Sequence, residues 1–70
     1  MNNKYGQYYT VDLFRRRGEM MVIGVGLQGQ IISVMYDGRY IKQWDGLDAE
    51  AFIAQSCEQS GWERGRDMVG

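Results

Sequence analysis

The dipeptide Asp37-Gly38 constrains the fold more than any other feature of the sequence, because it separates two short runs of β-branched and aromatic residues. A two-residue type I′ hairpin loop needs positive φ at both central positions, and Asp-Gly adopts that conformation readily. We therefore expect an antiparallel hairpin made of strands 31–36 and 39–44. The predicted opposite pairs are Tyr36 with Arg39, Met35 with Tyr40, Val34 with Ile41 and Ile31 with Trp44.

Two further strands are expected before this hairpin. From Tyr8 onward apolar and polar residues alternate, which is typical of a strand with one buried face. Residues 20–25 are apolar on both faces and form the second predicted strand. A charged turn at 15–18 and a glycine-containing turn at 27–30 connect these strands.

After residue 46 the apolar residues recur with the period of a helix. The residues of this stripe are Ala49, Phe52, Ile53, Ser56 and Cys57. Asp48 is a suitable N-cap, and Gly61 suits the left-handed position that follows a helix. The spacing predicts a helix over about 49–60.

The expected fold class is α+β, a four-stranded antiparallel β-meander with one C-terminal α-helix packed on one face (ββββα). Residues 8–62 form the single predicted domain, since the chain has 70 residues. Residues 1–7 are predicted to be a flexible N-terminus, and residues 63–70 an extended or frayed tail.

The composition excludes most catalytic chemistry. The chain contains no His and a single Cys, Cys57. Without an imidazole, it lacks the usual general base near neutral pH and the ligands of a zinc site. We therefore expect a protein that is not an enzyme and that holds no cofactor and no metal.

The segment 24–29 matches the dinucleotide-binding pattern GxGxxG. That pattern requires a helix to begin at its third glycine, whereas a β-branched run follows Gly29 here. We interpret the segment as the end of a strand and a hairpin turn, in which Gly24 and Gly26 relieve crowding or form a bulge.

The sequence favours a cytoplasmic protein without a membrane anchor. The longest apolar stretch without glycine, 20–23, is far below the roughly 18 residues that a membrane span needs. A lone thiol fits a reducing compartment. The formal net charge of −1 gives no global attraction to nucleic acid or anionic lipid.

A single helix can cover only one face of such a sheet. In the predicted register, the hairpin carries smaller aliphatic residues on one face and larger aromatic and Met residues on the other. We take the larger set as the uncovered candidate partner or dimer surface: Ile31, Met35, Tyr40 and Trp44. Two alternatives stay open. The sheet could curl into a partly open barrel whose second face closes on itself or under Tyr5, Tyr8 and Tyr9, or the helix could cover the aromatic side instead.

Three consecutive arginines, Arg15, Arg16 and Arg17, form the densest positive patch. With Tyr5, Tyr8 and Tyr9 near them in sequence, they are candidate contacts to phosphate groups or to an acidic partner. The alternative is a solvated turn that keeps the end of the sheet soluble.

The function that these features favour is a small non-catalytic protein-binding module. We expect it to be homodimeric and to act as a stoichiometric regulator or inhibitor of a partner protein, a role that small proteins of phages and plasmids also fill. The alternative is a nucleic-acid-binding regulator that uses the arginine turn and the nearby tyrosines.

Overall fold

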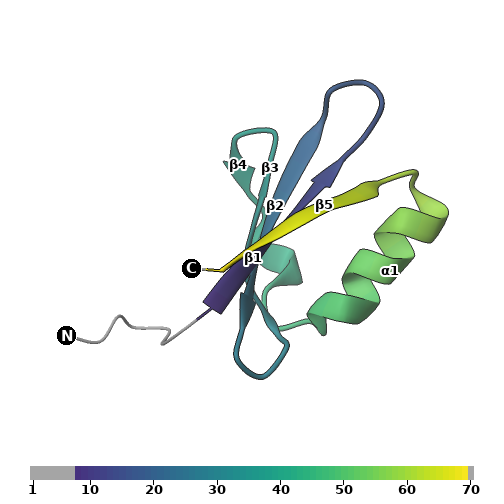
Figure 1. The fold of residues 1–70 in the computed structure, drawn as a ribbon. Coiled ribbons are helices and arrows are strands. Elements are labelled where there is room, and N and C mark those ends of the chain that lie inside the picture. Colours follow the sequence, from purple (N-terminus) through teal and green to yellow (C-terminus); the bar gives the residue numbers. More distant parts are fainter. Residues whose placement is uncertain (1–7, 70) are drawn as a thin grey trace.

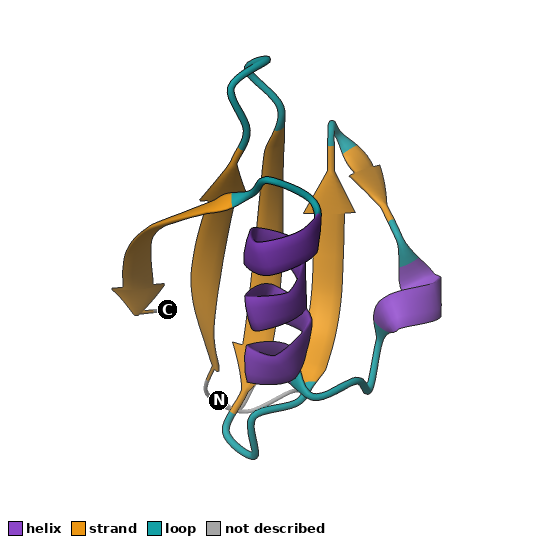
Figure 2. Ribbon diagram, turned by 90° about the vertical axis from the view of Figure 1, so that its right-hand side faces the viewer, coloured by secondary structure: helices purple, strands orange, loops and turns teal. Residues whose placement is uncertain are grey.

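A computed structural model describes residues 8–69, with side chains described for residues 8–65. The elements are β1 (Tyr8–Phe14), β2 (Met20–Gly26), β3 (Ile31–Tyr36), β4 (Arg39–Tyr40), the 3₁₀ helix η1 (Lys42–Trp44), α1 (Ala49–Gln59) and β5 (Glu63–Val69). The five strands form one antiparallel sheet in the order β4-β3-β2-β1-β5. Helix α1 lies across one face of this sheet (Figures 1 and 2). The α+β class, the antiparallel meander and the helix on one face are therefore confirmed.

The Asp37-Gly38 hairpin forms as predicted. Asp37 has φ 51° and Gly38 has φ 81°, so both central residues of the loop are left-handed. The opposite pairs at the loop are Met35 with Tyr40 and Tyr36 with Arg39.

The fourth strand is shorter than the predicted 39–44. After Tyr40, only the Ile41 amide continues the ladder, donating to the Val34 carbonyl. Residues 42–44 then turn into η1, and residues 46 and 47 return to hydrogen-bond with Ile31. The start of β3 therefore forms its hydrogen bonds with the turn that follows η1 instead of with a continuous fourth strand. This turn leads directly to the start of α1.

A bulge in β3 changes which side chains share a face. Gly24 of β2 pairs with Ser33, but its neighbour Val25 pairs with Ile31, so Ile32 is the extra residue. The extra residue shifts the alternation by one, and Ile31 therefore points to the same face as Val34.

Strand β5 is the main element that the sequence does not predict. The segment expected to be an extended or frayed tail pairs antiparallel with β1 and becomes an edge of the sheet. It begins directly after Trp62, whose side chain is only 5% exposed. The predicted flexible N-terminus, residues 1–7 with Tyr5, lies outside the described residues.

Helix α1 begins and ends close to where the sequence predicts. The Asp48 side chain accepts a hydrogen bond from the Ala51 amide at 2.9 Å, which caps the first turn. The helix ends at Gln59, and Gly61 takes the left-handed conformation with φ 74°.

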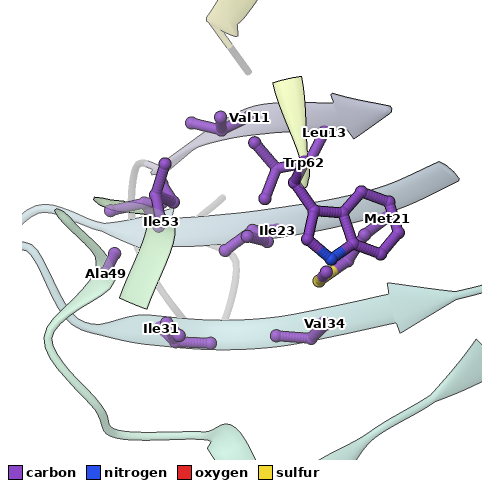
Figure 3. Close-up of a cluster of buried hydrophobic side chains, with 10 residues drawn as sticks. Val11, Leu13, Met21, Ile23, Ile31, Val34, Ala49, Ile53 and Trp62 are labelled. Carbon is purple, nitrogen blue, oxygen red and sulfur yellow. The ribbon is translucent and has the colours of Figure 1, made fainter. Parts of the chain in front are cut away.

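The hydrophobic core lies between α1 and the sheet face that it covers (Figure 3). Its ten side chains are at most 5% exposed and come from β1, β2, β3, α1 and the residue before β5. They are Val11, Leu13, Met21, Ile23, Val25, Ile31, Val34, Ala49, Ile53 and Trp62. No helix in the described part of the chain has the length and hydropathy needed to cross a membrane.

Candidate functional site

The sheet face opposite α1 carries no covering layer in the part of the chain that the structure describes (Figure 1). Alternation places every second side chain of β1 and β2 on this face, and the bulge brings Ile32 and Ser33 there together. We call this surface the open face. Its residues are Tyr8, Thr10, Asp12, Phe14, Met20, Val22, Gly24, Gly26, Ile32, Ser33, Met35 and Tyr40.

The open face is apolar and partly exposed. Four of its large side chains keep a substantial exposed fraction: Tyr8 37%, Phe14 42%, Met20 46% and Tyr40 66%. Val22, Ile32 and Met35 are half-buried. Asp12 lies in a row that continues through Val22 and Met35 to Tyr40, and Glu63 of β5 stands opposite Phe14 at the edge of the face. A surface of this kind resembles the centre of a protein interface more than an ordinary solvated sheet.

Two of the four residues predicted for this surface lie on it. Met35 and Tyr40 are opposite neighbours on the open face. The assignment of Ile31 and Trp44 to the same face is wrong. Ile31 is 1% exposed in the core, because the β3 bulge reverses its direction. Trp44 lies in η1 and packs against Phe52 of α1, with ring centroids 4.9 Å apart.

The described strands do not close into the barrel that one predicted alternative requires, and sealing of the face by the N-terminal residue Tyr5 lies outside the described residues. The sheet ends at β4 on one side and at β5 on the other, so it stays open. The apolar residues of β1 and β2 on the open face, Phe14, Met20 and Val22, were not predicted as site residues. The signal was present, because Met20 and Val22 alternate with the core residues Met21 and Ile23.

A pocket of about 360 Å³ hollows the open face. Tyr8, Tyr40, Ile32 and Ser33 line it, together with the charged residues Lys42 and Asp45. Strand β2 adds no side chain between the two tyrosines, since its residues on this face there are Gly24 and Gly26. A smaller pocket of about 240 Å³ lies at the other end of the face, near Met20 and Met35.

Two of the three glycines of the GxGxxG segment lie where neighbouring side chains crowd the backbone, and the third, Gly29, has a positive φ of 83°. A Cβ atom at Gly24 would lie 2.8 Å from Ser33 Oγ and 3.2 Å from Ile32 Cγ1. A Cβ atom at Gly26 would lie 2.8 Å from Gln30 Nε2. Strand β3 follows Gly29, so the segment lacks the helix N-terminus that binds a pyrophosphate in dinucleotide sites. The interpretation as relief of crowding next to a bulge is confirmed.

The three arginines line one open pocket of about 700 Å³ near the end of α1, but they are held differently. Arg16 and Arg17 are exposed in the turn between β1 and β2. Arg15 instead turns toward the end of α1, where its guanidinium lies 4.3 Å above the Trp62 ring. Its Nη1 atom donates to the Ser60 carbonyl at 3.1 Å. Arg15 is therefore held within the fold with its side chain 29% exposed, whereas Arg16 and Arg17 are exposed.

Arg15 belongs to a polar cluster with Glu19, Tyr36 and Trp62. The Arg15 Nε atom lies 2.8 Å from Glu19 Oε1, and Nη2 donates to Glu19 Oε2 at 3.0 Å and to the Tyr36 hydroxyl at 2.8 Å. The Tyr36 hydroxyl donates to Glu19 Oε2 at 2.7 Å, and the Tyr36 ring meets Trp62 edge-on. These contacts tie the β1–β2 turn to β3 and to the start of β5.

The cluster shifts the pKa of each titratable member. Hydrogen bonds from Tyr36 and then from Arg15 lower the pKa of the Glu19 carboxyl. The hydrogen bond to Glu19, followed by burial, raises the pKa of the Tyr36 hydroxyl. The hydrogen bond with Glu19 likewise raises the pKa of Arg15. Each shift favours the protonation state that completes the hydrogen bonds.

The described residues offer no metal-binding group of three or more His, Cys, Asp or Glu side chains. Cys57 is a free, half-buried thiol beside the core. Comparison of the chain with protein-family models, with curated proteins and with solved structures finds no match. The function therefore has to be argued from the geometry of the surface.

Proposed function

We propose that this chain is a non-catalytic protein-binding module that acts through its open face as a stoichiometric regulator or inhibitor of a partner protein. One observation carries the proposal: large apolar side chains of four strands gather on a sheet face over which no described segment lies. Burying one such side chain contributes about 1.5–3 kcal/mol. Leaving several exposed is costly for a small domain, whose total stability is roughly 5–15 kcal/mol at most.

The cytoplasm is the compartment that we propose for this activity. The single cysteine of the chain, Cys57, is a free thiol beside the core, which fits a reducing compartment.

Affinity capture from cells of the source organism tests the proposal. The bait is the tagged wild type, compared with Tyr40→Lys on the open face and with Gln55→Lys on the outer side of α1. Both residues are exposed and both changes add one positive charge, so they differ only in the surface that they alter. We expect a captured protein that Tyr40→Lys loses and Gln55→Lys retains. Capture that is equal for all three chains contradicts the proposal.

A second candidate function is a nucleic-acid-binding regulator, supported by the exposure of Arg16 and Arg17 in one turn. Phosphate contacts weaken steeply between about 50 and 200 mM salt. Titration with a single-stranded oligonucleotide at low salt tests this function, with a variant carrying Arg16→Gln and Arg17→Gln as the control. Binding that both salt and the double variant abolish supports it, and absence of binding at low salt ends it.

A further inference from the structure

We infer that the occupant of the open face is the open face of a second copy, in a two-fold symmetric dimer of sheet packed on sheet. This inference rests on the proposed function, because it takes the open face to be a protein-binding surface and names a second copy of this chain as the protein that it binds. Three properties of the face support it, namely its size, its charge and the distribution of large and small residues.

The size of the open face suits a stable dimer. Strands β1 to β3 stand about 4.8 Å apart and each presents roughly 20 Å of length, and the two residues of β4 add a short piece, which gives about 300 Å² in projection. The accessible area of side chains standing on a sheet is larger than its projection. Two such faces therefore bury on the order of 1,000 Å², which is about the size that a specific protein interface has to reach.

The charge of the open face also favours a second copy. Asp12 is the one charged side chain in the centre of the face, while Glu63, Lys42 and Asp45 stand at its edges. The centre therefore has no charge pattern that would select a foreign partner of opposite charge. The chain has a formal net charge of −1, and two copies therefore repel each other only weakly. A self-pairing face has one electrostatic requirement, which is that the two Asp12 carboxylates stay apart.

Large and small residues occupy neighbouring rows of the open face. The row Asp12, Val22, Met35 and Tyr40 lies on one side of the inward-pointing row Val11, Ile23 and Val34. The row Thr10, Gly24 and Ser33 lies on the other side. The row with Tyr40 therefore carries the larger apolar groups, and the row with Gly24 the smaller ones.

We place the two-fold axis between the two sheets, perpendicular to the strands and level with Ile23. This axis brings the row of larger residues of each copy over the row of smaller residues of the other. It places Val22 over Gly24 of the second copy and Met35 over Ser33. Asp12 then faces the Thr10 hydroxyl of the second copy instead of the other Asp12. The exposed Tyr40 ring is directed to the side of the face that holds the pocket of about 360 Å³. Sheets stacked in this way pack about 10 Å apart.

Sedimentation equilibrium over a range of concentrations tests the association. We expect the wild type to dimerise, Tyr40→Lys to weaken the dimer at least tenfold, and Gln55→Lys to leave it unchanged. Tyr40 is 66% exposed, so its replacement spares the core, and far-UV circular dichroism checks the fold of each variant. A wild type that stays monomeric to about 1 mM overturns the inference. Self-association that resists Tyr40→Lys overturns it as well.

Crosslinking tests the orientation without relying on loss of binding. In a Cys57→Ser background, chains with Met20→Cys and chains with Tyr8→Cys are mixed and treated with a short bis-maleimide. The proposed axis brings position 20 of one copy beside position 8 of the other, while two copies of position 20 lie roughly 20 Å apart along the strands. A covalent dimer that forms only when the two variants are mixed supports the orientation. A covalent dimer that the Met20→Cys variant forms by itself contradicts it.

The two proposals fail in different ways. A monomeric wild type that still captures a host protein through Tyr40 overturns the dimer and leaves the proposed function standing. A monomeric wild type whose capture is insensitive to Tyr40→Lys overturns both.

Discussion

The two faces of the sheet differ in how their side chains are covered, although neighbouring residues of the same strand supply both. Met21 and Ile23 of β2 point beneath α1 and are at most 2% exposed. Met20 and Val22, one position away, point to the open face, where Met20 is 46% exposed. The sheet is thus apolar on both sides but has one helix to cover it. The described part of the chain therefore supplies a covering layer for one face only, and the same strands carry apolar side chains on both.

The largest effect that we predict separates the two faces within β2. Ile23→Ala removes core packing and should lower the free energy of unfolding by about 2–5 kcal/mol. Val22→Ala, on the open face, should lower it by less than about 1 kcal/mol in the monomer. Urea unfolding at low protein concentration measures both. Equal losses would mean that the open face is already packed within a single chain.

A smaller loss of stability is expected from a substitution at Gly24, where side chains of β3 lie close to the backbone of β2. Gly24→Ala places a Cβ atom 2.8 Å from Ser33 Oγ, and we expect a loss of about 1–3 kcal/mol. Adding Ser33→Ala removes the nearest atom and should restore part of this loss, as a double-mutant cycle by urea unfolding can measure. Strict additivity of the two substitutions would show that the close contact is not the cause.

The dependence of stability on pH should report the Arg15 cluster. The pKa of Glu19 is lowered in the fold, so its contribution is present above the ordinary value of about 4.5 and is lost as the pH falls through the lowered value. The pKa of Tyr36 is raised, so its contribution is present below about 10 and is lost as the pH rises through the raised value.

Thermal unfolding across the pH range measures both ends of this profile. Glu19→Gln should flatten the acid side, and Tyr36→Phe should flatten the alkaline side. A profile that neither substitution changes would show that the cluster does not stabilise the fold.

The smallest effect is expected from the exposed arginines. Arg16→Ala and Arg17→Ala should each change the free energy of unfolding by no more than about 0.5 kcal/mol. Arg15→Ala should lower the melting temperature clearly more, because it removes the ion pair with Glu19 and the contact with Trp62. Differential scanning calorimetry of the three variants compares them directly. Three equal shifts would contradict the separate role of Arg15.

Local turn and cap chemistry made much of the fold predictable from the sequence. The positive φ angles at Asp37 and Gly38 and the cap at Asp48 depend on residues next to one another, which a sequence displays directly. Strand β5 depends on pairing with β1 across about fifty residues. Charged residues are common both in chain tails and in edge strands, where they discourage aggregation, so the composition of this segment does not distinguish the two.

The candidate surface was predictable only in part, for a similar reason. That one helix leaves one face uncovered follows from counting elements, and Met35 and Tyr40 follow from the hairpin register. Ile31 was misplaced because Gly24 and Gly26 suggested a bulge but did not fix its position at Ile32 of the neighbouring strand. The inward turn of Arg15 could have been found by continuing the alternation of Val11 and Leu13 by two residues.

Methyl NMR of the methionines with a soluble paramagnetic probe tests the central claim most directly, because Met20 and Met35 report the open face and Met21 reports the core. At low protein concentration, we predict strong relaxation of the Met20 and Met35 methyl groups and protection of Met21. As the concentration rises through dimerisation, Met20 and Met35 should become protected as well. Protection of all three methyl groups at the lowest concentration would contradict the account, since the face would then be sealed within one chain.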